Sequence, residues 1–174
     1  CYKKASESEP SVKVSLYQGV PKGDKMEDII QKCVELGIHD ITPVLTKRSV
    51  SRPQEKQAEK KRIRYSKIAL EAAQQSGRGI VPQINKMASL KEAVAACNSE
   101  CKIVFYEGGG KPISSIINPQ TQSVAVFIGP EGGFEQEEVC QIEEAGGICA
   151  TLGKRILRTQ TAPVAALSAI MLLT

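Results

Sequence analysis

Several residue types are scarce in this sequence. It has no tryptophan and one histidine, and Phe, Trp and Tyr together make up 4% of its 174 residues. No stretch approaches the roughly 18 consecutive apolar residues from which a membrane-spanning helix is built. No basic-then-apolar opening stretch leads to a cleavage site, so no secretory signal is predicted. We therefore expect a cytoplasmic protein that spans no membrane.

The motifs of several common ligand and reaction classes are missing. The sequence has no G-x-G-x-x-G run after a first strand and no G-x-x-x-x-G-K-[ST] run, which makes dinucleotide and P-loop phosphate sites poor explanations. It has no G-x-S-x-G and no Cys/His pair at an obvious spacing, so hydrolase interpretations are weak as well.

The six cysteines do not form a convincing metal pattern. Cys97 and Cys101 are spaced like a metal half-site, but a structural zinc site usually needs two close pairs of ligands. The other candidates are scattered along the chain: Cys33, Cys140, Cys149 and His39. We expect free, mostly buried thiols, no metal, and a surface or capping role for the histidine.

The overall composition is that of one globular domain. Apolar residues make up 41% of the sequence and charged residues 24%, and 174 residues suffice for a single domain with a core. The sequence begins with Cys1 rather than Met, and its opening residues look like the end of a preceding unit. We expect a fragment that lacks an N-terminal part.

Positive charge is concentrated in one segment. Residues 47–67 contain nine lysines and arginines and two glutamates, a net charge of +7, while the whole chain has a formal charge of +4. Residues 131–144 contain six glutamates and no basic residue, and we expect them to face elsewhere. Such polarity attracts a polyanion to one face, although an ordinary solvated helix explains the basic segment equally well.

Apolar periodicity predicts strands that alternate with helices. The predicted strands cover residues 12–18, 40–45, 79–84, 102–106, 123–128 and 147–152. The predicted helices cover residues 26–34, 55–76, 89–96, 136–145 and 163–172. Residues 123–128 are almost wholly apolar, as in a strand buried on both faces. The alternation favours a parallel α/β sheet.

Local signals refine two of these helices. Asp24, followed three residues later by Glu27, resembles a capping box at the start of the first helix, and Gly37 supplies its stop. The long basic helix has a thin inner stripe made of Ile63, Ile68, Ala69, Ala72 and Ala73.

The last helix is apolar on all sides, with Ser168 as its only polar residue between Val164 and Leu173. A helix of this kind must be buried all round. At the end of a small domain, this implies either threading into the core or cover from a second subunit, and we favour a dimer interface.

Three predicted strands end in glycine-bearing turns, at residues 106–110, 128–133 and 152–153. Glycine permits positive φ and a close approach of the backbone to a flat ligand. In open parallel sheets, ligands bind beyond the carboxyl ends of the strands. Any one turn could be an ordinary tight connection, but all three at one edge of a sheet indicate a small-molecule site.

Two stretches carry a family resemblance: FIGPEGGF at residues 127–134 and LGKRILRTQTA at residues 152–162. They resemble the signature of the bacterial 16S ribosomal RNA uridine N3-methyltransferases of the SPOUT superfamily. Supporting stretches are ELGI at 35–38, TKRS at 46–49 and AQQSGR at 73–78. The match covers nearly the whole chain from about Gly19, with Gln74 and Gln160 where many relatives carry Glu.

The resemblance implies a SPOUT-type α/β fold, a parallel sheet flanked by helices with a C-terminal trefoil knot. It also implies S-adenosylmethionine as methyl donor and a homodimer. Family members carry an N-terminal PUA-like barrel that helps to hold RNA. On this basis residues 1–18 are expected to be a remnant of that barrel or a linker, and residues 19–174 the methyltransferase domain.

The resemblance further implies the site residues. The expected cofactor contacts are Glu107, Gly129, Pro130, Glu131, Gly132, Leu152, Gly153, Ile156, Leu157, Arg158, Thr161, Ala162 and Ala165. The expected catalytic residues are Arg78 and Arg155, which would stabilise negative charge on the uracil oxygens, while no residue stands out as a base. From the concentration of positive charge, we expect the RNA contacts to lie between residues 48 and 78, at Arg48, Arg52, Lys61, Arg64, Gln75 and Arg78.

The implied reaction is methylation of uridine N3 in 16S ribosomal RNA of the 30S subunit, without a metal. Two alternatives stay open: a SPOUT enzyme that methylates ribose 2′-O, and a non-catalytic RNA-binding or ribosome-assembly module. The intact glycine loops favour an enzyme, because a pure binding module need not retain them.

Overall fold

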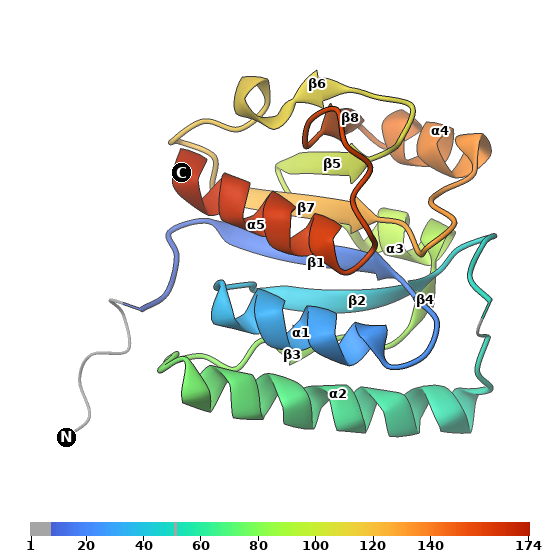
Figure 1. Ribbon diagram of the computed structural model, residues 1–174, viewed down its shortest axis with the longest axis vertical. Coiled ribbons are helices and arrows are strands. Elements are labelled where there is room, and N and C mark those ends of the chain that lie inside the picture. Colours follow the sequence, from blue (N-terminus) through green and yellow to red (C-terminus); the bar gives the residue numbers. More distant parts are fainter. Residues whose placement is uncertain (1–7, 51) are drawn as a thin grey trace.

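The computed structural model describes residues 8–50 and 52–174 (Figure 1). Its strands are β1 (Lys13–Gly19), β2 (Asp40–Leu45), β3 (Gln83–Ile84), β4 (Ala88–Ser89), β5 (Cys101–Phe105), β6 (Lys111–Pro112), β7 (Ser123–Ile128) and β8 (Gly147–Thr151). Its helices are α1 (Lys25–Glu35), α2 (Glu55–Gln75), α3 (Leu90–Ala96), α4 (Gln136–Glu144) and α5 (Thr161–Leu173), with a 3-10 turn at Ile113–Ser115.

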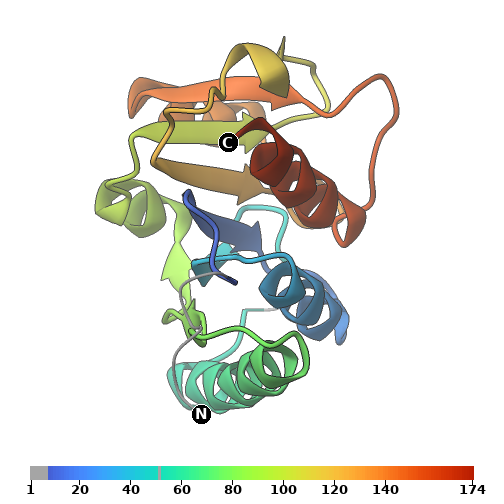
Figure 2. The same ribbon diagram turned by 90° about the vertical axis from the view of Figure 1, so that its left-hand side faces the viewer.

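All strands join one parallel sheet in the order β3-β2-β1-β7-β5-β8-β6, and β4 also pairs with β2. Helices α1 and α5 cover one face, with α2 packed along α1, while α3 and α4 cover the other face (Figures 1 and 2). The predicted parallel α/β sheet flanked by helices is confirmed.

Strand β7 shows how the two faces are filled. Val124, Val126 and Ile128 point into the core beneath α1 and α5, whereas Ala125 and Phe127 point into the core beneath α3 and α4. Phe127 stacks on Tyr17 of β1, with ring centroids 4.6 Å apart. The alternation of side chains along a strand therefore buries an almost wholly apolar segment on both faces, as predicted.

The predicted elements agree closely with the structure where the periodicity is strong. Strands β2 and β7 have the predicted bounds, and the main helices end within about three residues of their predicted ends. Residues 79–84 form a strand only at Gln83–Ile84, and the two-residue strands β4 and β6 and the 3-10 turn were not predicted. These short segments take their structure from their neighbours and contain too few residues to show a period.

Two local predictions for helices are wrong. Asp24 makes no side-chain capping bond, and the Glu27 carboxylate instead accepts from Arg64 of α2 at 2.8 Å. On α2, the predicted inner stripe is wrong only at Ile63, which is 61% exposed. Ala69, Ala72 and Ala73 are buried and Ile68 packs against the core, as predicted, and the buried Tyr65 was not predicted.

The predicted boundary at residue 18 is also wrong. Residues 13–18 do form a strand, but β1 lies inside the sheet, paired in parallel with β2 on one side and β7 on the other. Its side chains Val14 and Leu16 are buried in the main core. A strand with two parallel partners and a buried face is part of this domain and not of a barrel before it.

The five described cysteines, Cys33, Cys97, Cys101, Cys140 and Cys149, are free thiols. Burial raises the pKa of the Cys33 thiol to about 12, which keeps it protonated and unreactive. In the described ranges, no three His, Cys, Asp or Glu residues gather as a metal site would require. Every helix in the same ranges is too short or too polar to cross a membrane.

Arg78 is placed by the fold in a buried ion pair. It donates to Glu9 from Nη2 at 2.6 Å, and its Nη1 donates to the carbonyls of Val34 and Ile38 at 3.1 and 2.8 Å. Its side chain is 5% exposed and that of Glu9 15%. The pair joins the segment before β1 to the ends of α1 and α2.

We predict that Arg78→Met lowers the free energy of unfolding by about 3 kcal/mol, because the substitution leaves the buried Glu9 carboxylate without its cation. Urea denaturation measures the loss. Lys67→Met is the control, since Lys67 is exposed and its nearest carboxylate oxygen, on Glu71, lies 3.9 Å away. Equal losses in the two variants would contradict a buried role for Arg78.

The same pair has a pH signature. The hydrogen bond from Arg78 holds the pKa of Glu9 below its ordinary value of 4.5. The stabilisation is therefore complete above that value and is lost as the pH falls through the lowered pKa of the folded state. Glu9→Gln should flatten the acid side of the stability curve in urea titrations.

Candidate ligand-binding pocket

A pocket of about 710 Å³ opens at the carboxyl ends of three neighbouring strands, β7, β5 and β8. Its walls come from three segments that follow those strands, within residues 105–109, 128–134 and 150–162. Carboxyl ends of adjacent parallel strands meet at one edge of a sheet, so these distant segments converge there. The predicted convergence of three glycine-bearing turns at one edge is confirmed.

The pocket has an apolar floor and a basic rim. Ile128 and Phe134, both nearly fully buried, contribute to the floor together with the half-buried Phe105. The rim is the segment between β8 and α5, where Ile156 is 82% exposed. Three basic side chains on the same segment are also exposed: Lys154, Arg155 and Arg158. Such a site suits a ligand with a flat apolar part and charged ends.

Glycine is needed at specific points of the walls. A Cβ on Gly129 would lie 2.8 Å from the carbonyl carbon of Gly133, closer than real contacts allow. Gly153 has a φ of +112°, which side chains rarely tolerate. The first glycine lets the turn after β7 fold tightly on itself, and the second lets the chain leave β8 across the pocket.

A buried hydrogen-bond network connects three parts of the chain behind the pocket. Thr159 Oγ1 donates to the Gly129 carbonyl at 2.9 Å and accepts from Gln18 Nε2 at 3.1 Å. The same Gln18 nitrogen lies 3.0 Å from the Gly19 carbonyl. Gln18 Oε1 is buried without a partner within residues 8–50 and 52–174. The network fixes the end of β1, the turn after β7 and the rim relative to one another.

Glu131, in the turn after β7, is bound by residues at and before the start of α1. Its carboxylate accepts from Lys25 Nζ at 2.7 Å and from the Lys22 backbone amide at 3.0 Å. Partial burial opposes ionisation of this carboxyl, but the hydrogen bonds from Lys25 and from backbone amides outweigh it, and the pKa of Glu131 lies below its ordinary value. The start of α1 therefore anchors one side of the turn.

Arg48 anchors the other side of the same turn. Its Nε donates to Glu135 at 2.8 Å, and its Nη1 donates to the Gly132 carbonyl. Next to it, Lys47 donates to Glu138 through its backbone amide at 2.8 Å and pairs with Glu137 through its ammonium group. The prediction that the acidic segment faces away from the basic one is wrong, because α4 begins directly against residues 47 and 48.

Most of the predicted cofactor contacts line this pocket. Those that do are Glu107, Gly129, Pro130, Glu131, Leu152, Gly153, Ile156, Leu157, Arg158 and Ala162, together with Arg155. Three predicted contacts do not line it: Gly132, Thr161 and Ala165. Gly132 turns its open side toward Arg48, where an added Cβ would meet the arginine Cδ at 3.1 Å.

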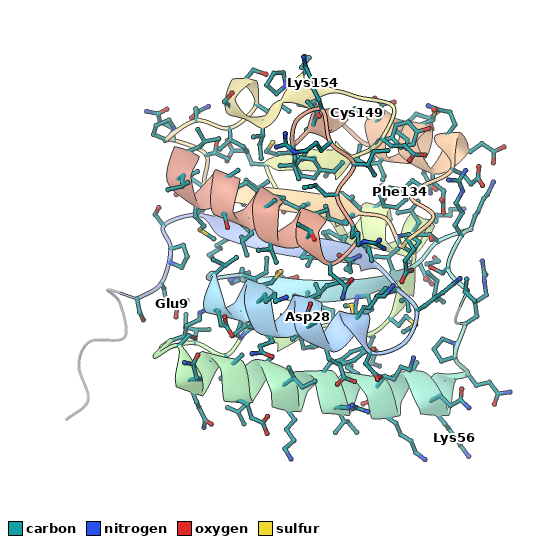
Figure 3. All side chains as sticks on the ribbon, viewed as in Figure 1. Glu9, Asp28, Lys56, Phe134, Cys149 and Lys154 are labelled. Atoms are coloured by element: carbon teal, nitrogen blue, oxygen red, sulfur yellow. The ribbon has the colours of Figure 1, made fainter. Side chains whose placement is uncertain are left out.

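The predicted roles of Arg78 in catalysis and RNA contact are not supported by its position. Glu9, the partner of Arg78, lies at one end of the strands, and Phe134, which lines the pocket, lies at the other end (Figure 3). Buried contacts occupy the guanidinium of Arg78, so the side chain serves the fold. Gln75, the last residue of α2, lies at the same end as Glu9 and is exposed.

The remaining predicted RNA contacts lie on or beside the basic helix. Arg52 donates to the Thr46 carbonyl at 3.1 Å, and Arg64 pairs with Glu27. Lys61 is half-buried on α2. Part of the positive charge of the +7 segment is therefore bound to neighbouring elements of the chain.

Lys25 and Phe105 line the pocket but lie outside the stretches singled out in the sequence. Other lining residues lie inside those stretches but were not named as contacts: Tyr106, Gly109, Gly133, Phe134, Lys154, Thr159 and Gln160. Their position within the glycine-bearing turns and motifs was the available signal. Nothing in the sequence marks Lys25, because it reaches the pocket only through the packing of α1 against the turn after β7.

The chain was compared with known proteins. A family model described as RNA methyltransferase domain matches residues 7–171. Ribosomal RNA small subunit methyltransferase E of Bacillus subtilis (strain 168) is 43% identical over 167 residues, or 91% of this chain and 65% of the relative. The protein of the same name from Mesomycoplasma hyopneumoniae (strain 232) is 39% identical over 158 residues, 90% of this chain and 68% of the relative.

A solved structure agrees in fold and sequence. The crystal structure of a ribosomal RNA small subunit methyltransferase E from Neisseria gonorrhoeae bound to S-adenosyl methionine superposes with a TM-score of 0.90 at 35% identity. The similarity covers 98% of this chain and 70% of that one. The chain thus spans about two thirds of the length of these relatives: 65%, 68% and 70%.

We predict that Thr159→Val lowers the free energy of unfolding by about 1–3 kcal/mol, because it removes the hydroxyl that bridges the buried Gln18 and Gly129 groups. Urea denaturation measures the change. Thr161→Val is the matched control, since that threonine is exposed at the start of α5. A loss of the same size in both variants would show that the network contributes nothing specific.

Proposed function

The chain belongs to the RNA methyltransferase domain family, with ribosomal RNA small subunit methyltransferase E among its relatives, and on this premise we propose that it binds S-adenosylmethionine in the pocket. The whole protein then methylates N3 of a uridine in 16S ribosomal RNA, in the cytoplasm. The observation that carries the proposal is the pocket itself, built from both glycine motifs at one edge of the sheet.

The residues present suit this cofactor. A volume of about 710 Å³ lies within the range of small-molecule sites. Leu152, Ile156 and Leu157 offer apolar surface for the two faces of an adenine ring, and the backbone around Gly153 offers amide groups for its polar edge. Glu107 and Arg158 offer charges opposite to those of the ammonium and carboxylate groups of the methionine part.

When bound, S-adenosylmethionine supplies an electrophilic methyl group on its sulfonium. In the proposed reaction the uridine N3 would lose its proton and bond to the methyl carbon while the bond from that carbon to sulfur breaks, leaving S-adenosylhomocysteine. The chain must therefore orient the base and stabilise negative charge on the uracil oxygens. We assign this role to Arg155, which is exposed at the pocket rim. The target base has to leave its stack to reach the rim.

The RNA approaches over the basic segment. Residues 47–67 begin beside the turn after β7 and continue as α2, and the exposed lysines Lys56 and Lys60 point into solvent. Phosphate contacts from such a helix position an RNA without reading its sequence. Arg52, Lys61 and Arg64 belong to this surface.

Two features of the C-terminal part complete the proposal. Pro163, Ala166, Leu167 and Ile170 of α5 are buried within the chain, while Leu172 is 87% exposed. The uncovered side of this apolar helix suits a second copy of the chain.

We further propose that the segment from β8 to α5 is threaded through a loop of the chain as a trefoil knot, an exception to the usual unknotted topology.

The cofactor proposal is tested by calorimetry of S-adenosylmethionine binding to this chain. Leu157→Arg should weaken binding at least about tenfold, because it places a charge in an apolar wall. Ile63→Arg is the matched control, since Ile63 is 61% exposed on α2 and does not line the pocket. Absence of binding by the unaltered chain would overturn the proposal.

The reaction is tested in cells. Nucleosides of 16S RNA are compared by mass spectrometry in cells with and without this protein, and N3-methyluridine should disappear in its absence. Loss of a 2′-O-methylated nucleoside instead would identify a ribose methyltransferase. An unchanged nucleoside profile would favour a non-catalytic RNA-binding module.

The proposed dimer is tested by a substitution at one exposed residue of α5. Leu172→Asp should shift the sedimenting species from a dimer to the 18.8 kDa chain, because it places a charge in an apolar interface. Leu70→Asp on α2, where the leucine is 42% exposed, controls for the change of charge. A monomer already in the unaltered protein would contradict the assignment.

A further inference from the structure

Arg48 holds the turn between β7 and α4 without itself lining the pocket. Its guanidinium donates to the Gly132 carbonyl and to Glu135 at 2.8 Å. Residues on both sides of Gly132 do line it, among them Glu131, Gly133 and Phe134. A change in the position of Arg48 therefore reaches the pocket wall through the backbone of this turn.

The arginine also packs on the glycine. A Cβ added to Gly132 would lie 3.1 Å from Arg48 Cδ and 3.3 Å from Arg48 Cβ, which is tighter than ordinary contact. The φ of Gly132 is outside the positive region, so its backbone does not itself demand glycine. The aliphatic part of Arg48 thus occupies the space that a side chain at position 132 would need.

An ion pair with Glu135 keeps Arg48 on this turn. The hydrogen bond from Arg48 holds the pKa of Glu135 below its ordinary value, so the carboxylate stays ionised at neutral pH. Glu135 is also the N-cap of α4, where its amide donates to the capping carboxylate of Glu138, which accepts from the Lys47 amide as well. The segment after β2 is therefore joined to the start of α4 by consecutive residues.

We propose that Arg48 is a positioning residue for the cofactor: it holds the turn at residues 129–134 in the shape that binds S-adenosylmethionine, and Gly132 is required because Arg48 packs on it. The proposal rests on the proposed cofactor of this pocket. Arg48 then acts on the turn at residues 129–134. Its position in the basic segment had instead suggested a contact with RNA phosphate.

The test is a double-mutant cycle on S-adenosylmethionine binding, measured by calorimetry with this chain and no RNA. Arg48→Ala and Gly132→Ala should each weaken binding by about three- to tenfold, the net value of one or two hydrogen bonds. The double variant should bind like Arg48→Ala alone, because an alanine at 132 no longer meets the arginine.

Two further variants separate positioning from charge and from folding. Lys91→Ala removes the same charge from an exposed position of α3 that does not line the pocket and should leave the affinity unchanged. Arg48→Lys keeps the aliphatic packing and one donor and should bind with intermediate affinity. Urea denaturation of all variants shows whether any loss of affinity follows a loss of fold.

Each outcome decides between stated explanations. If Gly132→Ala weakens binding equally with and without Arg48, the glycine faces the ligand and the proposal is overturned. Wild-type affinity in Arg48→Ala overturns it as well, and leaves the cofactor assignment intact. If the unaltered chain fails to bind S-adenosylmethionine, the proposed function fails together with this role of Arg48.

Discussion

The pairing of β7 with β1 on one side and β5 on the other is the constraint on which the rest of the structure depends. It places the first and the seventh strand at the centre of one parallel sheet, buried under helices on both faces. Because all strands run in the same direction, the turns after β5, β7 and β8 emerge at one edge. The pocket is a direct consequence of that order.

The walls of the pocket are held in place by hydrogen bonds and ion pairs between segments that lie far apart in the sequence. Thr159 and Gln18 fix the Gly129 carbonyl from behind, although Gln18 and Thr159 are 141 positions apart in the chain. Lys25 binds Glu131 on one side of the same turn, and Arg48 binds Glu135 on the other. A backbone turn of this kind has few side-chain contacts of its own, so its shape depends on these anchors.

The positive charges of the basic segment differ in their surroundings, which composition does not show. Within residues 47–67, Arg48 and Arg64 bind carboxylates of other elements, and Arg62 binds Glu59 within α2. Lys56 and Lys60 of α2 are exposed to solvent. A net charge of +7 shows that a segment is basic, but which of its cations are free is decided by the acidic residues that the fold places beside them.

The sequence by itself determined the order of the main strands and helices, the bounds of β2 and β7, and the meeting of three glycine-bearing turns at one edge, because periodicity and glycine turns are local properties of the chain. The family resemblance supplied most of the individual pocket residues. Only the tertiary structure decided that β1 belongs to the sheet, that Arg78 is buried with Glu9, and that Gly132 faces Arg48. The physical reason is that each of these depends on a partner far away in the sequence. Local patterns state which residues can be buried or paired, and the packing of distant segments selects the partner.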